Sequence, residues 1–384
     1  MTDIASTYLS RTLQENGSGG DRALALKVFS GTVLEAFRAK CVFYDNTGSI
    51  MVKKNLTGGH MAQWPVIGDD IDLYSLGTFT DSGGNNDYSD SGDVATDGGL
   101  ALGYHTAGEF IKGRKIKMSE QTVRVDDVLV SAIDVPFQDL DLSHFDVIRP
   151  FATKLGRSLA IDNDKKIATI AMKAATDPGL AGVYPGGQEV YIEGHSETTV
   201  AGNIPDSTIG SARFRNAAAE LAEAFDNDHV PEEGRYLFIS PLIRRVLRHE
   251  TDVFNRDYNP DAIAGDLNSR TIGMLEGFNL VVTTHMPGNY GVTDTMFKYM
   301  GGNEAHRKYD FKVTGADEDT AVPAAIALCG AQEGSAAIGM VQAAGIRTVI
   351  EDDERRNVKF MKAQMMVGYD IVSPWCAGVI GCYS

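Results

Sequence analysis

The chain has 384 residues, of which 43% are hydrophobic and 23% are charged, the composition of a soluble globular protein. Its 35 basic and 52 acidic residues give a net charge of −17, which argues against tight, specific DNA binding because such binding needs a basic face. We expect no membrane span and no secretory signal, and the four cysteines without CxxC spacing indicate free thiols in a reduced cytosolic setting.

The chain begins with features of an arm. Residues 1–20 are polar and end in a Gly/Ser cluster, which predicts a flexible segment. Residues 21–40 then repeat apolar side chains at helical spacing, with Gly31 weakening the middle of the pattern. The pattern allows one helix or two short ones.

The next region, 41–138, predicts strands and loops. "MAQWPVIG" (61–68) should be extended, because residues before Pro65 avoid the helical region, and Gly58 and Gly59 just before it should bend the chain. Residues 55–111 contain no Lys or Arg, and 80–99 are acidic and Gly-rich, which indicates a mobile loop. Within that loop, 87–98 only partly match a calcium-binding loop, because the glutamate at position twelve is missing, so a solvated acidic loop is favoured.

Basic residues and a strand pattern follow the acidic segment. The stretch 110–118 contains four basic residues, and 121–135 alternates as a strand does. Two extended segments therefore flank an acidic excursion, which predicts a long hairpin that projects from the rest of the subunit.

The strongest helix signal covers 141–176. Ser143 and Asp146 suit the helix start, Pro150 should kink the helix or mark a restart, and the apolar stripe shifts at 162–164. "TDPG" at 176–179 should end it. A continuous helix of roughly 34 residues would be about 50 Å long.

Residues 180–340 resemble an α/β unit. The patterns predict helices at 211–225 and 240–250, the second with Ser240 as N-cap, and strands at 235–240, within 273–288, and at 324–330. Residues 335–342 suit a strand or a short helix, and 346–372 a strand pair around a charged turn, "EDDERRN".

The usual catalytic patterns are missing from the sequence. There is no GxSxG elbow, phosphate-binding glycine loop or HExxH, so no catalytic, cofactor-binding or metal-binding residue is assigned. The eight histidines lack metal-ligand spacing, and His60 and His285 are interpreted as satisfied or solvated structural residues. The charge run 351–356 suits either a recognition patch or a solvated turn with ion pairs between subunits.

The predicted arm, hairpin and long helix share a property. Each offers more contact surface than one monomer can bury, which indicates that neighbouring subunits complete them. In this order, "LALKVFSGTVLEAF" (24–37), "MAQWPVIG", "FDVIRPFATKLGRSLA" (145–160) and "GMLEGFNLVVTTHMPG" (273–288) make the chain similar to the major capsid proteins of tailed bacteriophages with the Hong Kong 97 fold, those of T-seven-like podoviruses above all.

The resemblance implies an α+β fold with a fixed division of the chain. The parts are an N-terminal arm with a helix (1–45), an E-loop (46–120), a P-domain (121–177 and 341–372) with a spine helix at about 141–176, an A-domain (178–340) and a C-terminal tail (373–384). The E-loop would lie over a neighbouring subunit, and the A-domain loops would meet at the centre of each capsomer.

The resemblance also implies the function and the partners. The subunits would assemble into hexamers and pentamers of an icosahedral virion capsid around double-stranded DNA, on a scaffolding protein in the host cytoplasm, with a portal protein at one vertex. The DNA would be held without specific binding. The alternatives are an encapsulin-like compartment shell and a soluble α/β enzyme whose site matches no known motif.

Two features of this sequence depart from the founding member of the fold. That protein cross-links its subunits through an E-loop lysine, whereas residues 55–111 contain none, so we expect a non-covalent shell without cofactors. The acidic loop 80–99 also looks long, and it suits an outer-surface loop or a docking site for a neighbour or a decoration protein. The residues expected at subunit contacts are Trp64, His60, Lys112, Arg114, Lys117, Asp352, Arg355 and Arg356. For Trp64, the alternative is packing at the base of the hairpin arm.

Overall fold

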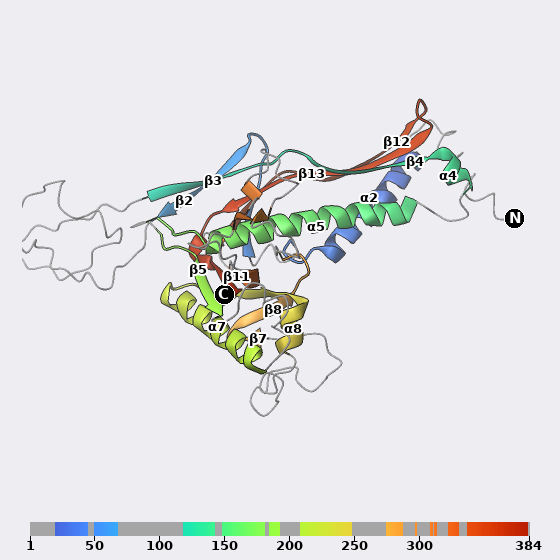
Figure 1. Cartoon of the computed structure of the whole chain (residues 1–384). Helices are drawn as coiled ribbons and strands as arrows, with labels where there is room; N and C mark the ends of the chain where they lie inside the picture. Colours follow the sequence, from blue (N-terminus) through green and yellow to red (C-terminus); the bar gives the residue numbers. More distant parts are fainter. Residues whose placement is uncertain are drawn as a thin grey trace, which may run out of the picture.

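The structure is a computed structural model, and it describes twelve segments of the chain. These are residues 20–44, 50–67, 118–142, 148–180, 184–192, 208–247, 274–286, 296–297, 308–309, 311–312, 322–329 and 336–382. Both helices and sheets occur, as the α+β expectation requires (Figure 1). A long, narrow layer of sheet and helix runs across the top of Figure 1, and a broader sheet with two helices lies below it.

The first described helix, α2, is continuous over Gly20–Lys40, so the alternative of two short helices is wrong. Strand β1 (Met51–Asn55) and strand β2 (Met61–Ile67) follow. The turn between them contains Gly59, whose φ of 91° lies in the region that glycine adopts at little cost. The predicted bend and the extended conformation of "MAQWPVI" are therefore both confirmed.

The upper layer is a four-stranded sheet in the order β1-β12-β13-β4. Its long members are β12 (Ile338–Asp353) and β13 (Val358–Ile371). They pair antiparallel, as predicted for the strand pair around the charged turn. For residues 335–342 the sequence allowed a strand or a short helix. The strand is correct, because β12 begins at Ile338. Strand β4 (Leu129–Pro136) forms one edge, and β1 forms the other, parallel to β12.

The strand predicted at 121–135 is in fact two strands. Strand β3 (Met118–Arg124) pairs antiparallel with β2 in a separate ribbon, whereas β4 pairs with β13. The chain leaves strand geometry at 125–128, where the buried Asp126 turns inward to a cluster of charged partners. A uniform alternating pattern cannot reveal such a change of sheet.

The long helix, α5, covers Ile148–Ala175 and lies along the upper sheet. Pro150 sits in its first turn, where a missing N–H costs nothing, so it marks a start rather than a kink. The 28 residues make a helix of about 42 Å, shorter than predicted, and α4 (Phe137–Leu142) is a separate short helix before it. Ser143 and Asp146, expected at the helix start, lie outside the described residues.

The lower part is built on a six-stranded sheet in the order β5-β14-β11-β6-β8-β7. Its helices are α7 (Thr208–Asn227) and α8 (Pro241–Leu247), and the Ser240 hydroxyl accepts the N–H of Ile243 at 3.3 Å as the predicted N-cap. The strands are β5 (Gln188–Ile192), β6 (Tyr236–Ile239), β7 (Met274–Leu275), β8 (Phe278–Val282), β11 (Val322–Leu328) and β14 (Ala377–Cys382). A separate two-stranded ribbon pairs β9 (Met296–Phe297) with β10 (Phe311–Lys312).

The end of the chain belongs to this lower sheet. Residues 373–384, expected as a C-terminal tail, include the short helix η3 (Pro374–Cys376) and strand β14, which lies between β5 and β11. The sequence "AGVIGC" has the small and branched apolar residues of a buried strand. The domain boundaries drawn from the sequence remain predictions.

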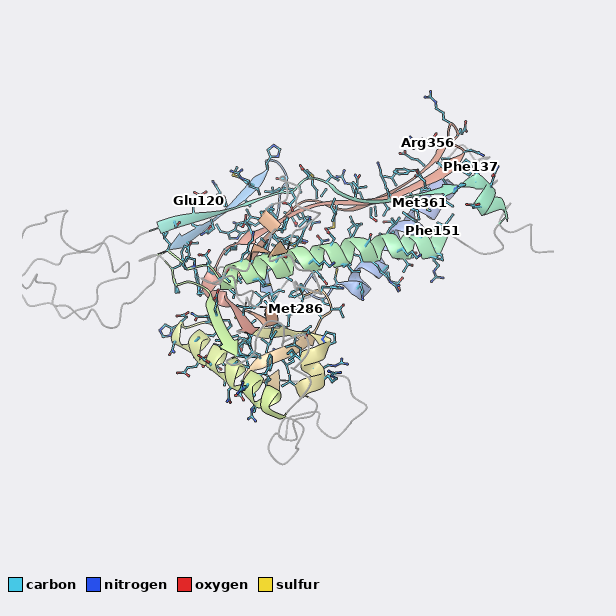
Figure 2. The ribbon with its side chains drawn as sticks, viewed as in Figure 1. Glu120, Phe137, Phe151, Met286, Arg356 and Met361 are labelled. Atoms are coloured by element: carbon cyan, nitrogen blue, oxygen red, sulfur yellow. The ribbon has the colours of Figure 1, made fainter. Side chains whose placement is uncertain are left out.

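One apolar core joins the two layers. Met361 of β13 is fully buried in it, and Phe151 near the outer end of α5 packs against it (Figure 2). Phe43, just after α2, stacks on Phe238 of β6 with ring centroids 4.1 Å apart. The N-terminal helix, the spine helix and the lower sheet therefore share their interior.

Candidate subunit interface

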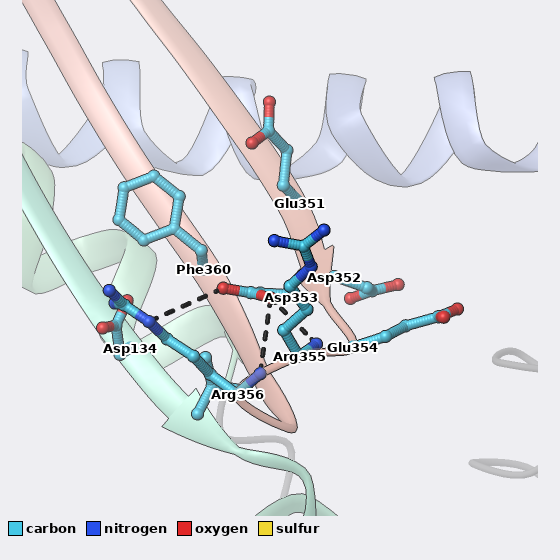
Figure 3. A pocket seen from close by; sticks show the side chains of 9 residues that line it. Asp134, Glu351, Asp352, Asp353, Glu354, Arg355, Arg356 and Phe360 are labelled. Carbon is cyan, nitrogen blue, oxygen red and sulfur yellow. Dashed lines mark hydrogen bonds and ion pairs between the residues drawn. The ribbon is translucent and has the colours of Figure 1, made fainter.

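The tip of the β12–β13 hairpin carries three of the residues predicted at subunit contacts (Figure 3). The Asp353 carboxylate accepts the backbone N–H groups of Arg355 and Arg356, at 3.0 and 3.4 Å, and so holds the turn. The Arg356 guanidinium lies 3.8 Å from the same carboxylate, and Asp352 lies 3.6 Å from Lys359. The side chains of Asp352 and Arg356 are exposed, and those of Asp353 and Lys359 are partly covered. Such pairs at the surface contribute about 0–1 kcal/mol each.

An open hollow lies beside this tip, and charged side chains surround it. Five carboxylates and two guanidinium groups line it, together with Val358 and Phe360. Little stability of the monomer depends on these groups, because water already solvates them. The charged lining residues are Asp134, Glu351, Asp352, Asp353, Glu354, Arg355 and Arg356.

Trp64, on the β2–β3 ribbon, is buried by its own chain, with 5% of its surface exposed. It belongs to a second, smaller apolar cluster with Val123 and Val341, and the Lys54 ammonium lies 4.2 Å from its ring centroid. Within the described part of the chain, its indole N–H has no hydrogen-bond acceptor. Trp64 therefore anchors the base of the projecting ribbon.

The remaining predicted residues differ in what can be said of them. His60 is exposed, and its backbone carbonyl accepts the N–H of Val125 at 2.9 Å. Lys112, Arg114 and Lys117 lie outside the described residues, as does the acidic segment 80–99. The structure therefore brings Asp352, Arg355 and Arg356 together at one tip and places His60 and Trp64 near the other end of the upper layer.

A buried polar network in the middle of α5 was not predicted from the sequence. Asp164 is fully buried and accepts the N–H groups of Val42 and Tyr44, at 2.7 and 3.3 Å. Its carboxylate also lies 2.8 Å from Nδ1 of His285. One side chain on the spine helix thus ties the end of the N-terminal helix segment to the loop after β8, and His285 is a satisfied structural histidine, as predicted.

A second set of partners surrounds Asp126, at the junction of β3 and β4. The Lys166 ammonium of α5 lies 3.6 Å from its carboxylate and 3.7 Å from that of Asp162. Lys308 also pairs with Asp126, and the Tyr309 hydroxyl donates to it. Burial and the negative charge of Asp126 raise the pKa of Tyr309 well above its ordinary value, so the phenol stays a hydrogen-bond donor.

The only sequence signal for this network was the shift of the apolar stripe at 162–164. Asn163, Asp164 and Lys166 are all buried although their types are usually exposed. Three polar residues in one turn of a long helix were interpreted as a change of face. This turn of the helix is covered except at Lys165, and its buried polar groups find partners from distant segments.

Neither metal chemistry nor a membrane span is supported by the described residues. Among them, no group of three or more His, Cys, Asp or Glu side chains is placed to hold a metal ion. No helix within the described segments is long and apolar enough to cross a bilayer. The features with the clearest chemistry are therefore the charged tip, the ribbon base and the buried network.

Comparison with solved structures identifies the fold. The chain is similar to the capsid structure of the cyanophage P-SCSP1u, with 20% identity, a TM-score of 0.63, and 89% of this chain and 88% of that chain covered. The mature capsid of bacteriophage PhiM1 gives 13% identity and a TM-score of 0.62 over 89% of this chain and 87% of that chain. The predicted Hong Kong 97-type phage capsid fold is thereby confirmed.

Comparison of sequences gives the same answer. The major capsid protein of Enterobacteria phage T3 is 28% identical over 255 residues, and that of Escherichia phage T7 is 26% identical over 236 residues. These matches cover 63% and 58% of this chain, and it spans 61% of the length of the T3 protein and 56% of the T7 protein. A family model described as Gp10A-like major capsid protein matches residues 95–380, and the chain belongs to this family of capsid proteins.

Proposed function

We propose that this chain is the major structural subunit of a tailed-phage virion capsid, and that it self-assembles into hexamers and pentamers of an icosahedral shell around double-stranded DNA. The observation that carries the proposal is the upper layer, where α5 covers only one face of the long sheet. The other face, with Val130 and Arg347, is exposed. An extended sheet of this kind is completed most readily by other copies of the chain.

The hairpin tip supplies a contact whose charges can match those of a second copy. It carries both carboxylates and guanidinium groups within a few residues, so copies related by symmetry can pair Arg355 or Arg356 of one with Asp352 of the next. Reversal of both arginines, R355E/R356E, should abolish shells but leave the far-UV spectrum and the unfolding midpoint of the unassembled subunit unchanged. Normal particle yield from this variant would remove the tip from the interface.

The ribbon and the loop beyond it form the second proposed contact. Trp64 anchors the base, and His60, Lys112, Arg114 and Lys117 are proposed to meet a neighbouring subunit along the E-loop. Reversing Lys112, Arg114 and Lys117 to glutamate should impair assembly more than folding of the monomer. Unchanged particle yield would refute their role.

The shell is proposed to be non-covalent, because the stretch 55–111 contains no lysine that could form a cross-link. It is also proposed to need no cofactor. Assembly would take place in the host cytoplasm on a scaffolding protein, with a portal at one vertex and DNA held without sequence specificity. A decoration protein could dock on the acidic loop 80–99. The family and the fold point to a structural protein rather than an enzyme.

Electron microscopy of the purified chain, expressed with and without the neighbouring phage proteins, tests the proposal. Icosahedral shells that contain DNA in infected cells would support it. Shells that hold a cellular cargo protein would favour an encapsulin-like compartment, and a chain that stays monomeric would overturn the proposal. Denaturing gels of mature particles should give one band at the monomer mass, whereas ladders would contradict the non-covalent shell.

A further inference from the structure

From Arg149 to Lys165, every exposed charged residue of α5 is basic. The exposed residues of this helix are Arg149, Pro150, Lys154, Arg157, Ser158 and Lys165. The one acidic residue of α5 that is partly exposed, Asp162, is paired with Lys166. We call Arg149, Lys154, Arg157 and Lys165 the basic face of α5.

Packing on both flanks of the helix defines this face. On one side α2 lies so close that a Cβ on Gly156 would fall 2.4 Å from the carbonyl oxygen of Val33. On the other side the hydroxyl groups of Ser158 and Ser131, the latter on β4, lie 2.7 Å apart. The four basic side chains occupy the exposed sector between these contacts, and the first and last of them, Arg149 and Lys165, are 16 positions or about 24 Å apart along the helix.

The four side chains of the basic face are also not neutralised by carboxylates of the described residues. Within the described residues, no ion pair involves the side chains of the basic face. By contrast, Lys166 and Lys308 both pair with Asp126, and Lys359 pairs with Asp352. In a chain with a net charge of −17, a row of unpaired cations is a site for an external anion.

The surroundings of the row favour a phosphate polyanion over an acidic protein. A protein interface needs apolar anchors at its centre and is depleted in lysine, whereas the exposed positions of this face offer no large apolar side chain. Phosphate backbones are held by arginine, lysine and hydroxyl side chains without apolar anchors. The basic face also extends about 24 Å along the helix, which is long enough to span several phosphates of a nucleic-acid backbone.

We propose that the basic face of α5 contacts the phosphate backbone of nucleic acid, without sequence preference. The inference deepens the proposed function, on which it rests, by assigning the face of the subunit that meets the packaged DNA. Each subunit contributes a weak, salt-sensitive contact, and many copies act together in a shell. The basic face of α5 then lines the inside of that shell.

The test is binding of the purified full chain to a double-stranded DNA fragment of mixed sequence, followed by fluorescence anisotropy over a range of salt concentrations. For four phosphate contacts the slope of log K against log salt is about −3.6. The variant K154Q/R157Q should bind about tenfold or more weakly at low salt, with a slope of about −1.8. The matched control K53Q/R245Q removes one exposed lysine and one exposed arginine elsewhere and should keep the wild-type slope.

A second probe separates the two kinds of polyanion. Polyglutamate should bind the wild-type chain more weakly than DNA. Equal loss of DNA binding in both variants, no binding by the wild type, or dependence on Lys154 and Arg157 for polyglutamate alone would overturn the inference. Electron microscopy of the same preparations reports on assembly separately. If K154Q/R157Q forms shells and binds DNA as the wild type does, only this inference is refuted. If the wild-type chain forms no shells, the proposed function is refuted.

Discussion

The six-stranded lower sheet and the four-stranded upper sheet bury their strands differently. In β6 and β11, consecutive residues are fully buried, among them Leu237, Phe238 and Ile239. Helix α7 packs against this sheet at β5 and β14, and the inner end of α5 packs against it at β14 and β11. This sheet therefore completes its core within one chain.

The upper sheet instead alternates. Along β13, Met361 and Ala363 are fully buried against α5, while the alternating residues Phe360 and Lys362 are only partly covered. One chain thus supplies a cover for one face only. The lower sheet therefore contributes most of the stability of the subunit, whereas the outer part of the upper sheet leaves a surface for other copies.

The largest expected effect lies at the inner end of the upper sheet, where it is packed as tightly as the lower one. A Cβ on Gly368 would fall 1.9 Å from the carbonyl oxygen of Arg124, and neither backbone can move freely. We expect Gly368→Ala to cost about 4 kcal/mol or more in urea unfolding of the unassembled subunit, or to prevent soluble expression.

The matched control for this prediction is Gly31→Ala in α2. A Cβ there meets nothing within 4 Å, so the helix should gain up to about 1 kcal/mol. Similar unfolding free energies for the two variants would mean that the inner end of the upper sheet is not tightly packed.

A pair of phenylalanines tests the comparison directly. Phe238→Ala removes a fully buried ring that stacks on Phe43 and should lower the free energy of unfolding by about 3–5 kcal/mol. Phe360→Ala removes a ring that is partly covered and should cost roughly 1 kcal/mol. Equal losses in chemical denaturation of the two variants would break the contrast between the sheets.

Variants of the buried network measure how much stability the middle of α5 contributes where the helix extends from the upper sheet to the lower one. Asp164→Ala leaves His285 and two backbone N–H groups without their acceptor, and it should cost about 3 kcal/mol. Asp162→Ala is the control, since Lys166 keeps Asp126 as a partner, and it should cost less than about 1 kcal/mol. Denaturant midpoints measured at one pH would reveal whether the order is reversed.

The smallest expected effect concerns Asp370 near the inner end of β13. Burial raises the pKa of its carboxyl, an effect that the nearby Lys308 and Lys173 and the N–H of Ile371 partly offset. An acid whose pKa is raised on folding favours the folded state at low pH, and this contribution is lost as the pH rises through the folded value. Asp370→Asn, which can still accept the Ile371 N–H, should therefore be slightly more stable than wild type at pH 7.

The pH dependence is the diagnostic part of this prediction. The stability difference between the variant and the wild type should disappear below the ordinary aspartate pKa of 3.8. Thermal midpoints at pH 7 and at about pH 3 would measure it. A variant that is less stable at pH 7 would show that the lysines dominate the environment of Asp370.

Much of the fold could be predicted from local patterns. The apolar period indicated the spine helix, Ser240 the start of α8, and the charged turn the β12–β13 pair. Each of these signals depends on neighbours within a few residues, so the printed sequence contains the whole of the relevant physics.

Other features depended on distant segments and could not be predicted. The division of 121–135 between two sheets follows from the burial of Asp126 beside Lys166, and the place of β14 follows from its pairing with β5 and β11. Their partners lie far away in the sequence, and no periodicity encodes which strands pair. The candidate contact residues were predicted from their charge or from their place on the projecting hairpin, and their partners in other subunits remain proposals.

By itself, the sequence determined the element types, the acidic balance and the resemblance to phage capsid proteins, because hydrophobic period, turn chemistry and charge are local properties. Only the tertiary structure decided that Trp64 is covered by its own chain, that Asp164 joins three distant segments, and that the cations of α5 share one exposed face. The physical reason is burial: whether a polar or aromatic side chain meets water depends on which elements pack around it, and that is fixed only when the whole chain has folded.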